Sequence, residues 1–333
     1  MRGTRPRVPV VLCIDVEPDG AFIDPARQPP WVGYERAYLF FQEIRQELAI
    51  ATGSEAHFSW FYRMDPQISE TYGSGAWPAL AYPEYIRDLE ANGDEIGIHT
   101  HLYRLDRKTG GWLIDNRDLE WVAHCIRSSY DAFERLFGRT SISHRFGDRL
   151  IDDRALNLVE ELGSRFDLTV EPGFNEIPSR ELRERMTGSL PDMRGVPKEP
   201  YRRSRVDFRK PDPARMEALW MLPLSTAEVR VGSFGLFSPT RFFSLHLALK
   251  PRYFRTAAKK LVKTLDRPYL AIALKTDMLK DASLASNMRH NLKLFVRGFR
   301  SRRFVFATPE EAMKILGYMN GDHCLSCSEA SRR

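Results

Sequence analysis

The sequence predicts a single α/β domain in which parallel strands alternate with helices. Short apolar runs and segments with apolar residues at helical spacing follow one another along most of the 333 residues, which is the pattern of parallel sheets and barrels. Hydrophobic residues make up 43% of the chain, enough for one large core. No segment repeats at a fixed period, which argues against a solenoid.

The first half of the chain contains the clearest units. An apolar run at 8–15 predicts the first strand, and residues 34–49 predict the first helix. Asp65 followed by Pro66 is typical of a helix start, because Asp accepts from free N–H groups and proline fits the first turn. Further strands are expected at 56–64, 94–101, 141–147 and 165–173, and further helices at 66–73, 82–93, 118–138 and 152–163.

The second half is interrupted by a change in composition. Residues 179–215 are rich in Arg and Pro and are expected to form a long loop or partly disordered insertion. Beyond it we expect strands at 218–226, 268–278 and 303–311, helices at 253–266 and 283–301, and an ambiguous helical stretch at 239–251. About seven β/α units result, in one domain over 8–316, followed by a disordered tail over 317–333.

Charge and cysteine usage limit the class of protein. The net charge is +6, below that of a dedicated nucleic-acid protein, so no nucleic-acid partner is expected. The cysteines suggest no disulfide framework and a reducing compartment; they are Cys13, Cys125, Cys324 and Cys327. The apolar run behind the basic N-terminus is too short for a signal peptide or a membrane span, so we expect a cytoplasmic protein.

Polar side chains occur where the predicted strands end. The carboxyl ends of parallel strands are where functional groups gather, and four such ends carry Asp15 and Glu17, His99 and His101, Arg145 and Asp148, and Lys275 and Asp277. Because side chains alternate along a strand, Asp15 and Glu17 can point to one side, and so can His99 and His101. Carboxylates and imidazoles are typical ligands of zinc or a similar divalent ion. The sequence therefore predicts a metal site here.

Each feature also has a plain structural interpretation. Asp19 with Gly20 is more typical of a solvated turn. Asp15 directly follows a buried run, where a carboxylate without a partner would be costly. The single CxxC pair near the C-terminus is a weak zinc signal. The remaining histidines are expected to pack or to face solvent; they are His57, His124, His144, His246, His290 and His323.

Five motifs resemble, in order and rough spacing, those of the polysaccharide deacetylases with NodB homology, which are metal-dependent carbohydrate esterases. They are CIDVEPDG, GDEIGIHTHLY, SHRFGD, FDLTVEPG and FVFATPEEAM. The resemblance covers roughly residues 8–316 apart from the Arg-rich insertion and identifies the chain as a divergent member. It implies a distorted (β/α) barrel with fewer than eight regular strands.

The resemblance also implies roles for particular residues. Asp15 takes the place of the general base, Glu17 and His99 take the places of metal ligands, and Arg145 takes the place of the arginine that orients the base. The family's second histidine lies four positions after the first, where this chain has Tyr103, so only His101 can serve.

A second departure concerns the general acid. The late motif normally supplies a histidine for this role. Here Lys275, Asp277 and His246 are the candidates, and we assign Asp277. One divalent ion, zinc first, is the expected cofactor.

The expected function is removal of N- or O-acetyl groups from a carbohydrate or glycoconjugate intermediate of cell-surface polysaccharide biosynthesis. Tyr103, Trp112, Asp148 and Lys275 are expected to bind substrate, with Trp112 in a loop as the best partner for a sugar ring. The basic stretches at 201–210, 252–263 and 289–303 are more typical of a solvated face, with contact to an anionic membrane surface as the alternative. Two other functions stay open: a non-catalytic carbohydrate-binding barrel, and another barrel metallohydrolase acting on C–N bonds.

Overall fold

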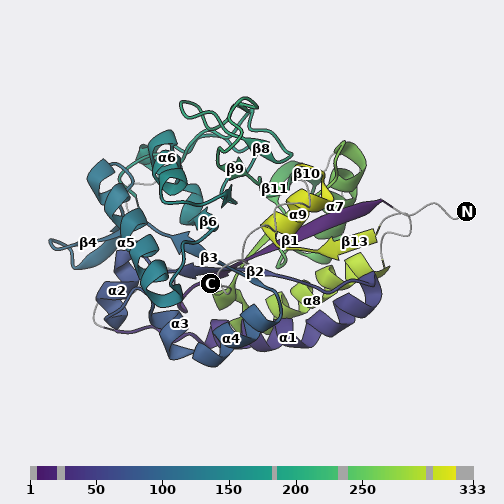
Figure 1. The fold of residues 1–333 in the computed structure, drawn as a ribbon, viewed down its shortest axis with the longest axis horizontal. Helices are drawn as coiled ribbons and strands as arrows, with labels where there is room; N and C mark the ends of the chain where they lie inside the picture. The colour runs from purple at the N-terminus through teal and green to yellow at the C-terminus, as the bar shows by residue number, and fades with distance from the viewer. Residues whose placement is uncertain (1–5, 21–26, 182–185, 232–238, 298–302, 320–333) are drawn as a thin grey trace, which may run out of the picture.

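A curled, mainly parallel sheet forms the centre of the molecule (Figure 1). The computed structural model describes residues 6–20, 27–181, 186–231, 239–297 and 303–319. The sheet contains β1 (Arg7–Val16), β2 (Ser59–Arg63), β3 (Glu95–Thr100), β6 (Ser143–Phe146), β7 (Phe166–Asp167), β8 (Tyr201–Arg202), β9 (Trp220–Met221), β12 (Leu270–Lys275) and β13 (Arg303–Phe306). Its order is β12-β1-β2-β3-β6-β7-β9-β8, and β13 also pairs with β1.

The sheet closes on itself through irregular backbone. The strands from β12 to β9 run parallel, and only β8 is antiparallel to its neighbour. The chain after β9 returns to β12, where the Ser225 N–H donates to the Ala271 carbonyl (3.0 Å) and the Ala273 N–H donates to the Leu245 carbonyl (3.3 Å). The predicted fold, a distorted barrel of about seven units, is confirmed.

Helices cover the outside of the sheet, with α1, α4 and α8 together on one side (Figure 1). The helices are α1 (Val32–Thr52), α2 (Pro66–Tyr72), α3 (Trp77–Ala81), α4 (Pro83–Ala91), α5 (Leu119–Phe137), α6 (Asp153–Glu161), α7 (Pro251–Thr264), α8 (Ala282–Arg297) and α9 (Pro309–Ile315). The described ranges also contain the 3₁₀ turns η1 (Gly147–Arg149), η2 (Ser179–Glu181) and η4 (Thr276–Lys280). The predicted start of α2 is confirmed, because Asp65 accepts from the Gln67 N–H at 3.1 Å.

Side-chain alternation divides the core in two. Along β1, Val10, Leu12 and Ile14 belong to the large cluster under the helices. Val11 and Cys13 belong to a smaller cluster that includes Phe61, Ala271 and Ala273 from the neighbouring strands. Since successive side chains point to opposite faces, Asp15 continues the row of Val11 and Cys13. Odd-numbered residues of β1, β2, β3 and β12 therefore point into the barrel.

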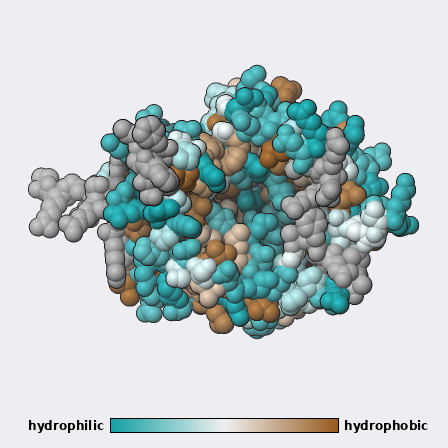
Figure 2. Space-filling model, turned by 180° about the vertical axis from the view of Figure 1, so that it is seen from behind, coloured by the Kyte–Doolittle hydropathy of each residue, from teal (hydrophilic) through white to brown (hydrophobic). Residues whose placement is uncertain are grey.

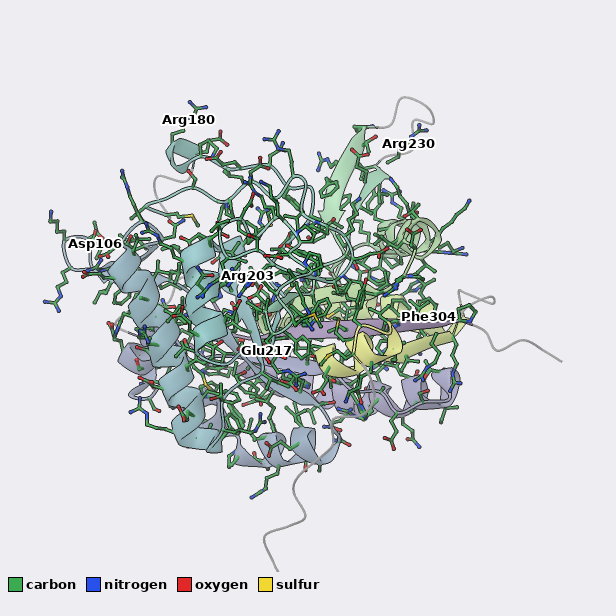
Figure 3. The ribbon with its side chains drawn as sticks, turned by 45° about the horizontal axis from the view of Figure 1, so that its top comes forward. Asp106, Arg180, Arg203, Glu217, Arg230 and Phe304 are labelled. Carbon is green, nitrogen blue, oxygen red and sulfur yellow. The ribbon has the colours of Figure 1, made fainter. Side chains whose placement is uncertain are left out.

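Two hairpins lie outside the main sheet, and both correct the sequence analysis. The hairpin of β4 (Tyr103–Asp106) and β5 (Gly111–Ile114) contains Trp112, so the prediction that Trp112 lies in a loop is wrong. The hairpin of β10 (Thr226–Arg230) and β11 (Thr240–Ser244) occupies part of 239–251, so the helical prediction there is wrong. Apolar residues at mixed spacing allowed either reading, and pairing with β10 decided it. Asp106 and Arg230, at the ends of these hairpins, lie on opposite sides of the molecule (Figure 3).

The insertion at 179–215 packs on α6 where it is described. Arg203, next to β8, is fully buried and lies beside α6 (Figure 3). Beyond Met319, the tail with Cys324 and Cys327 lies outside the described residues. None of the helices in the described ranges is long and apolar enough to cross a membrane. Viewed from behind, hydrophilic residues cover most of the surface, and hydrophobic residues show in and around a central hollow (Figure 2).

Candidate functional site

Three buried side chains converge at the carboxyl end of the sheet. Glu17 follows β1, and His99 and His101 lie at the end of β3. Glu17 Oε1 lies 3.1 Å from His99 Nε2 and 3.2 Å from His101 Nε2, and the two Nε2 atoms are 3.0 Å apart. Among the described residues this is the group whose ligand atoms could hold a metal ion. The structure thus brings together the three residues that the sequence suggested as ligands.

The outer nitrogens of both rings face acceptors. His99 Nδ1 lies 3.0 Å from the Arg145 carbonyl oxygen. Because a carbonyl only accepts, Nδ1 carries the proton and the Nε2 lone pair points at Glu17. His101 Nδ1 lies 3.1 Å from Asp148 Oδ2. A carboxylate or carbonyl behind a ligating histidine is the usual support of a metal site.

The backbone at η1 fits closely against His101. A Cβ on Gly147 would lie 2.2 Å from the His101 ring, so only glycine fits there. Asp148 and Arg149 both adopt left-handed conformations, with φ of 53° and 61°. Such backbone is strained for residues with side chains and persists when the surroundings impose it. Here it directs the Asp148 carboxylate at His101.

Asp15 lies beside this group and is held by an arginine. Arg145 Nε donates to Asp15 Oδ1 at 2.8 Å, and its Nη1 donates to the Leu168 carbonyl at 2.6 Å. Both side chains are buried. The pair satisfies the charges of both residues and fixes the orientation of the carboxylate.

Lys275, at the end of β12, contacts Glu17. Its Nζ lies 3.1 Å from Glu17 Oε1. Burial alone would lower the pKa of Lys275, but the Glu17 carboxylate outweighs it and the pKa is raised. Burial likewise opposes ionisation of Glu17, yet Lys275 and His101 hold its pKa well below the usual range. Burial lowers the pKa of His99, so its ring is neutral, as a metal ligand must be.

A cavity of about 460 Å³ opens above these residues. Asp15, Tyr103, Arg145, Asp148 and Lys275 line it. The side chains of Glu17, His99 and His101 lie beneath them and are at most 3% exposed. Five of the ten residues singled out from the sequence therefore share one cavity.

Two of the remaining residues are placed elsewhere. Trp112 is 7% exposed and is absent from the cavity lining. Asp277 also does not line the cavity; its Oδ1 is buried without a hydrogen-bond partner in the described structure. Burial and the Glu17 charge raise the pKa of Asp277.

His246 lines the same cavity, although the sequence analysis expected it to pack or face solvent by default. The Ala248 N–H donates to His246 Nδ1 at 3.1 Å, so Nε2 carries the proton of the neutral ring. Burial lowers the pKa of His246 to about 4. The ring is therefore a neutral hydrogen-bond donor near pH 7.

Sequence reasoning missed a buried pair beneath the site. Arg63 Nε donates to Asp65 Oδ2 at 2.9 Å, and the same Asp65 oxygen accepts from the His101 N–H at 3.2 Å. Asp65 thus caps α2 and fixes the backbone of His101. The sequence signal was Arg63, a charged residue in an apolar strand, which needs a buried partner.

Comparison with known proteins supports the fold. No family model and no curated protein matches the sequence. The chain is similar to a structure described as a polysaccharide deacetylase from Mycobacterium smegmatis, with 13% identity, a TM-score of 0.52, and coverage of 99% of this chain and 96% of that chain. A second, described as a glycoside hydrolase/deacetylase from Parabacteroides distasonis, has 14% identity and a TM-score of 0.57 over 93% and 71% of the two chains.

A third similar structure is described as a polysaccharide deacetylase from Pseudomonas aeruginosa PAO1, with 14% identity, a TM-score of 0.50, and coverage of 94% and 92%. At such low identity these likenesses bear on the fold. The chain therefore has the fold of the polysaccharide deacetylases, as the resemblance of its sequence motifs predicted.

Proposed function

We propose that this protein is a metal-dependent hydrolase that removes acyl groups, acetyl in the simplest case, from a carbohydrate or glycoconjugate. The observation that carries the proposal is the convergence of Glu17, His99 and His101 directly beneath a cavity lined by Asp15. The fold shared with deacetylase structures supports it.

The donor set fits a divalent ion. Two imidazole nitrogens and a carboxylate oxygen lie within 3.2 Å of one another, close enough to bind one cation together. Nitrogen and oxygen donors in this number suit zinc. When bound, such an ion supplies a Lewis acid and lowers the pKa of a water molecule.

Residues of the chain supply the other catalytic groups. Asp15 removes the proton from the attacking water, and Arg145 holds the carboxylate in place. His246, a neutral donor in the same cavity, hydrogen-bonds the oxygen on which negative charge develops.

Two groups can protonate the departing amine or alcohol. Asp277 has the raised pKa that favours a protonated carboxyl, and Lys275 lines the cavity. Asp277→Asn and Lys275→Met separate them, because loss of the proton donor reduces kcat by about 10²–10⁴-fold. The variant that keeps most of its turnover identifies the other residue as the donor.

The test begins with metal content, measured by mass spectrometry on protein purified without a metal-affinity tag and equilibrated with zinc. About one equivalent is expected in the wild type, and none in Glu17→Ala or His99→Ala. His124→Ala, at an exposed histidine, is the matched control and keeps its metal. Release of acetate from N-acetyl and O-acetyl sugars then tests the activity. Bound metal without release of any acyl group, acetyl or longer, contradicts the proposed reaction.

One observation favours a second function. The Lys275 ammonium already neutralises Glu17, and a cation there competes with a metal ion. A barrel that binds acetylated sugars without metal is therefore the second candidate. Absence of zinc in the wild type, together with binding of acetylated sugars and no acetate release, identifies it.

The biological setting is proposed from the sequence alone. We propose a cytosolic glycoconjugate intermediate of surface polysaccharide synthesis as substrate. Basic residues on the exposed face of α7, including Arg252, Arg255 and Lys259, support contact with an anionic membrane surface. Pelleting with phosphatidylserine vesicles that weakens as salt is raised would support this contact, and salt-independent pelleting would exclude an electrostatic one.

A further inference from the structure

The cavity above Asp15 has an apolar wall that the removal of an acetyl group does not require. Ile114, Met186, Leu190 and Met278 line it, from three separate parts of the chain. The whole cavity measures about 460 Å³, so it has room for more of the substrate than the methyl of an acetyl group, which is about the size of one water molecule (about 30 Å³). We name these four residues the apolar wall.

The cavity offers little for stacking a sugar ring. Tyr103 and Phe146 are the aromatic residues among its described lining. Tyr103 already stacks on His101, with ring centroids 5.3 Å apart, and Phe146 is 1% exposed. No tryptophan lies in the described lining. Apart from these two rings, the apolar part of the lining therefore consists of aliphatic and thioether side chains.

The segment 186–191 separates this cavity from a second one of about 440 Å³. Met186 and Leu190 face the first cavity, and Thr187, Ser189 and Pro191 face the second. The segment thus presents an apolar side to Asp15 and a more polar side away from it.

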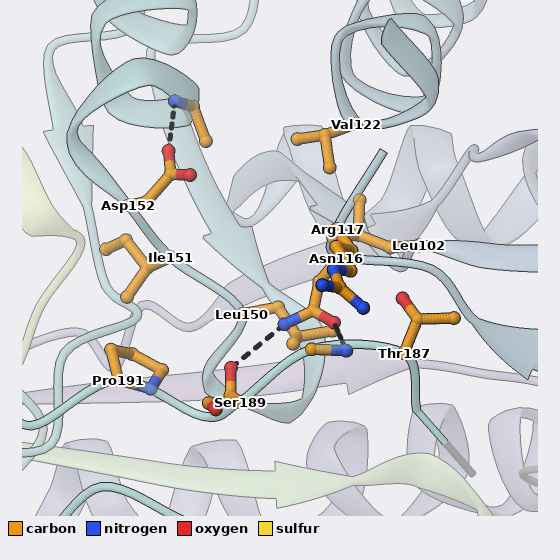
Figure 4. Close-up of a pocket in the computed structure, with 12 residues that line it drawn as sticks. Leu102, Asn116, Arg117, Val122, Leu150, Ile151, Asp152, Thr187, Ser189 and Pro191 are labelled. Atoms are coloured by element: carbon orange, nitrogen blue, oxygen red, sulfur yellow. Dashed lines mark hydrogen bonds between the residues drawn. The ribbon is translucent and has the colours of Figure 1, made fainter. Parts of the chain in front are cut away.

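Hydrogen bonds fix this segment in place. Asn116 Nδ2 donates to the Ser189 carbonyl at 2.9 Å, and Asn116 Oδ1 accepts from the Gly188 N–H at 2.7 Å (Figure 4). The Thr187 hydroxyl donates to Asp115 at 2.7 Å. Met186 and Ile114 are paired across a β-bridge. The part of the apolar wall formed by Met186 and Leu190 therefore lies on a segment whose backbone is held in place by hydrogen bonds.

From this arrangement we infer that the substrate carries an acyl group longer than acetyl, whose chain lies along the apolar wall while its carbonyl faces Asp15 and His246. The inference rests on the proposed hydrolase function and names its substrate class: an N-acyl or O-acyl sugar with a medium-length chain. The lining combines polar residues such as Asp15 and His246 with the apolar wall, and these two kinds of side chain match the carbonyl and the alkyl chain of such a group.

The reaction balances as a hydrolysis. Water adds to the acyl carbon, the bond from that carbon to the sugar nitrogen or oxygen breaks, and the proton from water ends on the leaving atom. The products are a medium-chain carboxylate and the free amino or hydroxyl sugar, and the second proton of water goes to the amine or to solvent. No oxidant or reductant is needed.

The first test measures binding and does not depend on turnover. Acetate, butanoate, hexanoate and octanoate are titrated into the zinc-equilibrated full chain by calorimetry. Each added methylene should tighten binding by about fourfold until the wall is filled. Leu190→Trp should weaken octanoate binding by at least about tenfold, whereas Leu39→Trp, at a leucine that is 62% exposed on α1, should not change it. Affinity independent of chain length overturns the inference.

The second test compares initial rates of amine release from N-acetyl-, N-butanoyl-, N-hexanoyl- and N-octanoylglucosamine. The inference requires a higher kcat/KM for a longer chain than for acetyl, and a lower hexanoyl-to-acetyl ratio in Leu190→Trp. If kcat/KM is highest for the acetyl substrate in both the wild type and Leu190→Trp, the inference is wrong. The hydrolase function is then still supported. No release with any chain, despite length-dependent carboxylate binding, contradicts the hydrolase and keeps the apolar binding site.

Discussion

Two clusters of charged side chains lie in different parts of the molecule. They differ in how their hydrogen-bond donors and acceptors are paired. Next to α6, Glu160 accepts from Arg203 Nη2 at 2.9 Å and also pairs with Arg215. Every close contact there joins a donor to an acceptor. At the carboxyl end of the sheet, a Glu17 carboxylate oxygen and the Nε2 atoms of His99 and His101 converge within 3.2 Å of one another, and Lys275 donates to the same carboxylate.

This difference helps to distinguish charged residues that stabilise the fold from charged residues that serve a functional site. A cluster of paired donors and acceptors contributes to stability, although burial of its ions limits the gain. The Glu17 cluster brings together a carboxylate oxygen and two imidazole nitrogens, which are atoms that can bind a metal ion. The Arg203 cluster should therefore respond to mutation through stability, and the Glu17 cluster through metal binding and turnover.

The largest expected effect is on turnover. Asp15→Asn should reduce kcat by about 10²–10⁴-fold, because the amide cannot accept the proton of water. Zinc content should stay unchanged, since Asp15 lies outside the group of Glu17, His99 and His101. Circular dichroism at the assay temperature checks that Arg145, left without its partner, has not unfolded the site. A fully active variant excludes Asp15 as the base.

The second effect is on the Arg203 cluster. Glu160→Gln leaves Arg203, which is fully buried, without a counter-charge, and should lower the free energy of unfolding by about 3 kcal/mol. Urea denaturation measures it. The adjacent Glu161→Gln breaks an exposed pair with Arg205 and should cost less than about 1 kcal/mol. If the Glu160→Gln variant remains folded but loses zinc, the proposal that the Arg203 cluster affects stability alone is contradicted.

The third effect concerns the zinc affinity of the Glu17 cluster. Asp148→Asn removes the negative charge behind His101 and should weaken zinc affinity by about 10–100-fold. Competition with a chromogenic chelator measures this. Asp131→Asn, at an exposed position of α5, is the matched control. Equal affinity in all three proteins would mean that Asp148 serves only the strained turn.

The smallest effect concerns pH and lies far from both clusters. The hydrogen bond to Glu311 raises the pKa of His57. A raised histidine pKa stabilises the fold fully below the unfolded value of about 6.5, and this stabilisation is lost as pH rises through the folded value. The difference between wild type and His57→Gln, less than about 1 kcal/mol because the pair is partly solvated, should therefore fade from pH 6 towards pH 9. A constant difference across urea melts in that range contradicts the assignment.

The sequence was sufficient for the alternating elements and for the ligand group. Alternation along β1 and β3 fixed the side of Glu17, His99 and His101 once parallel strands were assumed, and the structure brings these three residues together. The cap at Asp65 was also predictable, because it depends on neighbouring residues only.

What could not be predicted depends on contacts between distant segments. The role of His246 arises from a bridge between its segment and Ala273 of β12. The position of Trp112 depends on pairing of β5 with β4, where Leu105 lies opposite it. Such pairings are set by tertiary packing, and local propensity does not determine them.

The positions of the candidate ligands and of Lys275 in the sequence have a consequence for metal binding during synthesis of the chain. All three ligand side chains lie within the first 101 residues, whereas Lys275 belongs to β12, which covers the other edge of β1. A chain emerging N-terminus first completes the ligand group long before its competing ammonium is made. Under the proposed metal-binding function, zinc supplied during translation meets these residues before Lys275 is made, while zinc added to the finished protein has to displace the Lys275 ammonium from Glu17. The metal content of the protein should depend on when the ion is supplied.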